Sequence, residues 1–172
     1  MTQYSEDVKS QWAQVENVYQ RRADLIPNLV STVQQYAEFE KSTLTAVIEA
    51  RSRVSQIKID ASNITPEQLQ KFQEAQGQLT SALSRLLVVS EQYPNLKANE
   101  QFMDLQKQLE GSENRITVER QKFNDIAKIY NVYIKSFPRN LLAGMYNFTE
   151  RPYFQAEAGA DKAPDVDKLF KR

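Results

Sequence analysis

Carboxylates and arginines alternate along residues 110–120, and no other stretch offers residue types closer to a catalytic or metal-binding set. Glu110 and Glu113 are three residues apart, so on a helix they share one face. Inward carboxylates hold metal ions in some helical bundles, but there they act together with histidines, and this chain has no histidine. Glu119 falls at a position expected to face the core, where an unpaired charge is costly. We interpret the stretch as a polar layer with Glu119 paired to Arg51, and we predict no catalytic residue, cofactor or metal site.

A second charged group lies near the start of the chain, in the run RRADLIPN, and includes Arg21, Arg22, Asp24, Pro27 and Asn28. Proline is disfavoured inside a helix by about 3 kcal/mol, whereas it is tolerated in a first turn after a capping residue such as Asp24. We therefore predict a helix break at Arg22–Asp24. The free N–H groups of a new helix could bind an anion or a partner. A capped turn whose arginines pair with acidic neighbours is the favoured interpretation.

Composition excludes several classes of function. The 172 residues carry 22 basic and 22 acidic side chains and no cysteine. Disulfides and thiolate metal sites are therefore excluded, and a basic surface for nucleic acid is not favoured. The apolar runs are all shorter than the roughly 18 residues of a membrane span, so we expect the chain as given to be soluble.

Apolar residues recur in alternating steps of four and three, which is typical of helices buried along one face. The pattern predicts an all-α, up-and-down four-helix bundle for residues 1–154, followed by a flexible tail at 155–172. One kinked helix through Pro27 is the alternative at the first boundary. The predicted helices cover residues 5–22, 25–58, 66–92 and 97–137, with a short turn at 140–146.

Gly111 interrupts the last long helix, where glycine costs about 1 kcal/mol relative to alanine. Close packing of another helix is the favoured explanation, and a partner docking on exposed backbone is the alternative.

An aromatic return segment begins at the end of that helix. Its aromatic residues are Phe137, Tyr146, Phe148, Tyr153 and Phe154, and it also contains Pro138 and Leu142. We expect it to fold back and cover one end of the bundle. A surface for a protein or a membrane is the alternative, since aromatic side chains are enriched at such surfaces.

Five collinear blocks together resemble the LemA family: residues 15–30, 49–51, 93–116, 137–145 and 151–154. The resemblance implies a helical bundle and, in typical members, a transmembrane helix directly before the first helix. It implies no established enzymatic activity. The positions that we single out as family-signature or structural residues are Arg21, Arg22, Asp24, Pro27, Asn28, Arg51, Glu113, Asn114, Arg115, Glu119, Phe137, Pro138, Leu142, Tyr153 and Phe154.

We therefore expect a bacterial, membrane-anchored scaffold or protein-interaction module without enzymatic activity, whose anchor is missing from this chain. A protein partner is expected and nucleic acid is not; which side of the membrane the domain faces is left open. The alternatives are a soluble adaptor or self-associating bundle, and a metal-dependent enzyme that uses the mid-bundle carboxylates.

Overall fold

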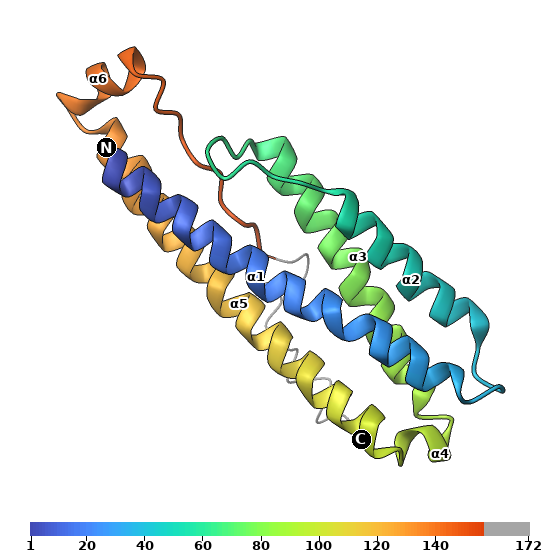
Figure 1. Cartoon of the computed structure of the whole chain (residues 1–172). Helices are drawn as coiled ribbons and strands as arrows, with labels where there is room; N and C mark the ends of the chain where they lie inside the picture. Colours follow the sequence, from blue (N-terminus) through green and yellow to red (C-terminus); the bar gives the residue numbers. More distant parts are fainter. Residues whose placement is uncertain (157–172) are drawn as a thin grey trace, which may run out of the picture.

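Amphipathic sequence becomes helix almost throughout the computed structural model, which describes residues 1–156 (Figure 1). Its elements are α1 (Thr2–Gln34), α2 (Lys41–Gln56), α3 (Pro66–Ser90), α4 (Pro94–Lys97), α5 (Glu100–Lys135) and α6 (Arg139–Met145). No strand occurs within these residues, so the predicted all-α class is confirmed.

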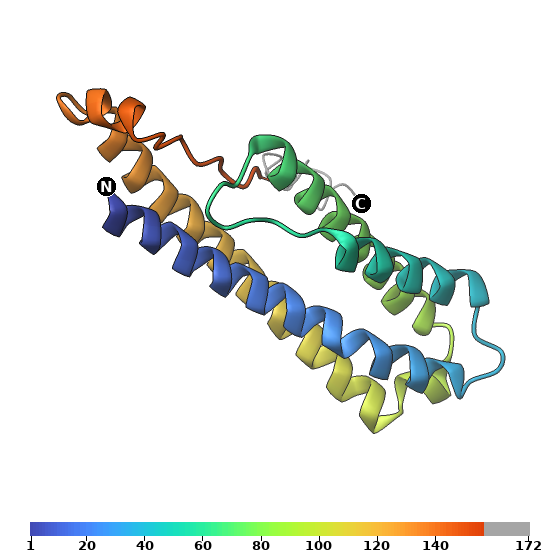
Figure 2. The same cartoon turned by 45° about the horizontal axis from the view of Figure 1, so that its top comes forward.

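The four long helices form two antiparallel pairs. The two longest helices, α1 and α5, pack along each other, and α2 packs along α3 (Figures 1 and 2). The α1–α5 pair extends past the start of α3, and α6 lies at its far end, beside the N-terminus. From α6 an extended segment returns toward α3.

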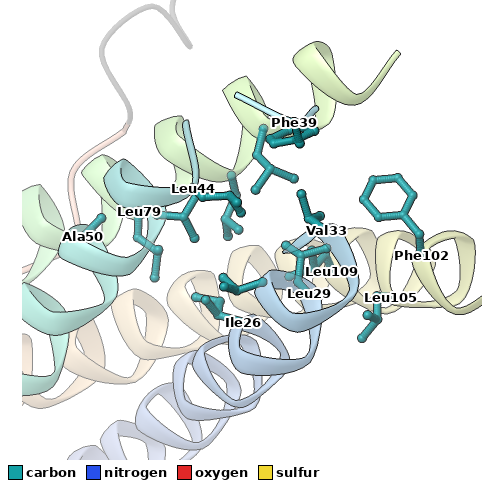
Figure 3. Close-up of a cluster of buried hydrophobic side chains, with 14 of the residues drawn as sticks. Ile26, Leu29, Val33, Phe39, Leu44, Ala50, Leu79, Phe102, Leu105 and Leu109 are labelled. Carbon is teal, nitrogen blue, oxygen red and sulfur yellow. The ribbon is translucent and has the colours of Figure 1, made fainter. Parts of the chain in front are cut away.

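Two apolar cores lie one after the other along the molecule. One core is built from the second half of α1, the first half of α5 and large parts of α2 and α3 (Figure 3). The other joins the first half of α1, the second half of α5 and the start of α3. Each of α1, α3 and α5 passes from one core to the other at a polar residue, respectively Arg22, Gln76 and Glu113.

The predicted helix break at Arg22–Asp24 is wrong, because α1 continues through Pro27 to Gln34. Proline has no N–H to donate to the carbonyl four residues earlier, which here belongs to Ala23. Arg51 on α2 supplies the missing donor, with its Nε 3.2 Å from the Ala23 oxygen. Burial of Ile26 and its neighbours against α2 and α3 offsets the remaining cost of the proline.

The chain leaves the helix at residues 35–40 instead. Phe39 is buried there against Tyr93, with ring centroids 5.0 Å apart. The Tyr93 hydroxyl donates to the Glu38 carbonyl at 3.0 Å. This turn is held by a contact that is distant in the sequence, which explains why local signals did not locate it.

The later helices begin and end near their predicted positions. Thr65 caps α3 through a full capping box with Gln68, and Asn99 caps α5. The short α4 precedes α5, and α6 lies where a short helical turn was predicted, at 140–146. The tail predicted at 155–172 lies outside the described residues except for its first two. The assignment of residues 1–154 to one domain stays a prediction.

Candidate functional site

Arg22 is the centre of the polar layer between the two cores, with only 1% of its side chain exposed. Its Nη1 donates to Glu113 Oε1 and to Thr80 Oγ1, both at 2.6 Å. Its Nη2 donates to the Gln76 carbonyl oxygen at 3.2 Å and also to the Gln76 side chain. Thr80 in turn donates to the Gln76 carbonyl at 3.1 Å. One guanidinium therefore ties α1 to both α3 and α5.

The chemistry of this layer is structural. Arg22 lies over the ring of Tyr19, 5.3 Å from its centroid. Burial raises the pKa of Tyr19, against the opposing effect of nearby arginines. Glu113 serves Arg22 as a counter-ion, and Thr80 and Gln76 accept its other hydrogen bonds.

The predicted pair of Glu119 and Arg51 is wrong. Arg51 is exposed and caps the α1 carbonyl described above. Glu119 accepts a hydrogen bond from Gln11 Nε2 at 2.7 Å and pairs with Lys122 at 3.1 Å. The hydrogen bond from Gln11 lowers the pKa of Glu119, which is the opposite of the shift expected for a buried general acid. Periodicity placed Glu119 toward the core but could not say which residue of another helix faces it; that residue is Gln11 on α1.

A surface hollow of about 470 Å³ between α1 and α5 brings together residues from two of the blocks. Arg21 and Asp24 line it from α1, and Gly111 and Arg115 line it from α5. Asp24 accepts a hydrogen bond from Gln20 at 2.7 Å, whereas Arg21 and Arg115 have no ion-pair or hydrogen-bond partner in the described part of the chain.

Two predictions about this region are wrong. A Cβ built on Gly111 meets no atom within 4 Å, so close helix packing does not explain the glycine. The favoured capped turn at Asp24, and the alternative of an anion site there, both required a helix to begin near Asp24, and no helix begins there. Asn28 and Asn114 are exposed, and Asn28 lies within α1.

Three side-chain amides hold the return segment in place, and none of them is among the residues predicted from the sequence. Asn131 donates to the Arg151 carbonyl and accepts from the Arg151 N–H, both at 2.8 Å. Asn124 forms the same pair of bonds with Phe154, at 2.9 and 2.8 Å. Gln73 on α3 does so for the residue after Phe154. These amides replace the partner strand that an extended backbone otherwise needs.

A signal for this ladder was present in the sequence. Asn124 and Asn131 are seven residues apart, so they lie on one face of α5 two turns from each other. Asparagine is a poor helix former, and its repetition on one face favours a structural role. Arg151, also buried, donates to the Ser62 carbonyl at 2.7 Å and lies over the ring of Tyr130.

The return segment covers the bundle only in part. Phe154 is buried against Trp12 and Phe123, as predicted. Phe137 and Leu142 are exposed, however, and Tyr153 is half-exposed while accepting a hydrogen bond from Asn131. The prediction that residues 137–145 cover the bundle end is therefore wrong. Pro138 is exposed too and forms the N-terminal boundary of α6.

Neither metal chemistry nor a membrane span is indicated by the described helices. Across residues 1–156, acidic side chains do not gather in threes as a metal site would require. None of the helices there combines the length and hydropathy needed to cross a bilayer. A hollow of about 1070 Å³ lies between α2, α3 and the end of the return segment, and small residues such as Ala46 and Gly77 line part of it.

Comparison with known proteins places the chain among named relatives. The model of the LemA family matches residues 11–167. Magnetosome protein MamQ 2 of Paramagnetospirillum magneticum is 29% identical, over 97% of this chain and 68% of its own length. Magnetosome protein MamQ of Magnetospirillum gryphiswaldense is 27% identical, over 96% and 67% respectively. Protein LemA of Metamycoplasma hominis is 29% identical, over 79% of this chain and 58% of its own length. None of these names specifies a reaction.

Proposed function

This chain belongs to the LemA family, and on that premise we propose that it is a non-enzymatic, membrane-tethered bacterial scaffold that contacts a protein partner. The scaffold is the predicted up-and-down four-helix bundle, and the core shared by all four long helices supports that arrangement. The tether is an apolar helix before α1, which the family resemblance implies.

The surface hollow at Gly111 carries the protein-contact part of the proposal. Arg21 and Arg115 flank it with guanidinium groups that no described residue engages. Two such groups beside an open glycine suit a carboxylate-bearing segment of a partner, because arginine binds carboxylates in a bidentate manner. The glycine leaves helix backbone accessible between them.

The non-enzymatic part of the proposal rests on the partners of the polar side chains between the two cores. Arg22 and Glu113 neutralise each other, and the pKa of Glu119 is lowered by Gln11. A carboxyl group that serves as a general acid near neutral pH needs the opposite shift. These groups therefore support a structural role.

Photo-crosslinking in cells tests the contact. A photoreactive amino acid at Gln108, which lines the hollow, should crosslink to one discrete partner. The same probe at Gln121, exposed on another face of α5, is the matched control. Arg21→Glu with Arg115→Glu should abolish the Gln108 adduct. Equal crosslinking from both positions, or an adduct insensitive to the charge reversal, would refute the assignment of this surface.

The tether is tested on the native gene and the full-length protein. About 20 predominantly apolar residues are expected upstream of Tyr4, and the full-length protein should stay in the membrane fraction after an alkaline carbonate wash. Recovery of the native protein in the soluble fraction would refute the tether and favour the soluble-adaptor alternative.

A further inference from the structure

The tip of the molecule, residues 137–146, exposes an unusual amount of apolar side chain. The exposed fractions are 80% for Phe137, 62% for Leu141, 48% for Leu142, 76% for Met145 and 69% for Tyr146. Scattered single apolar residues are normal on a protein surface, but a contiguous group marks an interaction site. Five of the ten residues of this tip belong to the group.

The exposure does not come from a frayed end. Ala143 faces inward and is buried in the core formed by the first half of α1 and the second half of α5. The Phe148 N–H donates to the Ala143 carbonyl at 2.9 Å, and Asn147 adopts a left-handed conformation with φ 56°. These are features of a Schellman helix end. Arg139 fixes the other end, 4.3 Å above the ring of Tyr133. A fixed helix thus presents its apolar face outward.

The stretch of chain that leads into and forms the tip is basic in sequence. The sequence from Ile126 to Thr149 contains Lys128, Lys135 and Arg139 and no acidic residue, although the chain as a whole has no net charge. Glu150 is the first acidic residue beyond and pairs with Lys135 at 2.8 Å. Exposed apolar side chains with Arg139 among them suit an anionic bilayer surface, where apolar groups enter the interface and a cation meets the headgroups.

We propose that the tip at 137–146 docks on the surface of an anionic phospholipid bilayer, with Phe137, Leu141 and Met145 inserted among the headgroups. The tip and the N-terminus of α1 lie at the same end of the molecule (Figures 1 and 2). The inference therefore deepens the proposed tether and rests on it, because an anchor before α1 would hold this end against the bilayer. Attachment at both the anchor and the tip would fix the orientation of the helical bundle relative to the membrane.

Vesicle cosedimentation of the protein comprising residues 1–172 tests the docking. Vesicles containing phosphatidylglycerol should bind the protein, and vesicles of phosphatidylcholine alone should bind it more weakly. A variant with Phe137→Gln, Leu141→Gln and Met145→Gln should lose at least about tenfold in partitioning, because three apolar side chains no longer leave water. Circular dichroism should show both proteins equally helical, since none of the three side chains is buried.

A matched control removes the same number of exposed apolar side chains elsewhere. Ile48, Val88 and Val118 are 47%, 69% and 48% exposed, on α2, α3 and α5. Their triple replacement by glutamine should leave vesicle binding within about twofold of the original.

The outcomes separate the docking from the tether. Absence of binding to phosphatidylglycerol vesicles, or equal loss in the tip and control variants, would overturn the docking. Light scattering without lipid provides a second check. If it shows a dimer, and the tip substitutions abolish that dimer, the surface binds a second copy of the chain and the docking is also overturned. Either result leaves the membrane fraction of the full-length protein unchanged. Recovery of that protein in the soluble fraction would refute the tether whatever the vesicles show.

Discussion

Removal of the Glu113 carboxylate should destabilise the fold by an amount that depends on Arg22. In Glu113→Ala the guanidinium of Arg22, only 1% exposed, loses its counter-ion. A hydrogen bond to a charged group contributes about 1.5–3 kcal/mol, and breaking a fully buried ion pair costs about 3–5 kcal/mol. The Glu113 side chain is 40% exposed, so water screens part of the interaction. We expect a loss of about 2 kcal/mol.

The same substitution should cost much less when Arg22 is already gone. In an Arg22→Met background the buried charge is removed, and Glu113 can turn to water at its exposed edge. Glu113→Ala should then change the free energy of unfolding by no more than about 0.5 kcal/mol, as expected of a surface position. The difference between the two backgrounds measures the coupling, about 1.5 kcal/mol.

Urea unfolding followed by circular dichroism measures these differences. With a slope of about 2 kcal/mol per molar urea, 2 kcal/mol corresponds to a midpoint shift of about 1 M. Glu110→Ala is the control, because Glu110 is exposed on the same helix and accepts only a 3.4 Å hydrogen bond from Gln106. Additive losses within about 0.5 kcal/mol would show that Arg22 and Glu113 act independently and would refute the reasoning.

Three further predictions test other parts of the structure. Pro27→Ala restores a donor inside α1 and should make Arg51→Ala about 1 kcal/mol less costly than it is in the original chain, as measured by a double-mutant cycle in urea; equal costs would contradict the proposed compensation. Asn131→Leu removes both hydrogen-bond partners of the buried Arg151 backbone and should lower the free energy of unfolding by about 2–3 kcal/mol. Limited proteolysis should then cleave the return segment earlier; unchanged cleavage would show that the side-chain amides are not needed to hold it. Gly111→Ala should stabilise the protein by about 1 kcal/mol, seen as a higher thermal midpoint, because its added Cβ has open space; a lower midpoint would reveal a backbone constraint at this site.

Helix ends with local signals were predictable because their stabilising groups are close in sequence. Thr65 and Gln68 form the capping box that begins α3. The end of α1 had no such signal. It depends on Phe39 packing against Tyr93, a contact that no local window contains. For the same reason, the sequence could not show that Arg51, on another helix, donates the hydrogen bond to α1 that Pro27 cannot donate.

In the polar layer, too, local sequence features were predictable and contacts between distant segments were not. Periodicity correctly indicated a polar layer near residue 113, but a stripe gives only the face on which a residue lies. It does not say which residue of another helix meets it. Arg22, interpreted as part of a turn, is the buried partner of Glu113, whereas Arg51, predicted to pair with Glu119, is exposed.

The sequence by itself determined the helical class, the faces of the helices and the capped ends, because these follow from residue types at fixed local spacing. It also indicated the family, through the resemblance of five collinear blocks. Only the tertiary structure decided the polar partners, the surface that gathers Arg21 and Arg115, and the exposure of the tip at 137–146. The physical reason is that burial and pairing depend on which helix stands opposite, and this is fixed by packing between segments distant in the chain.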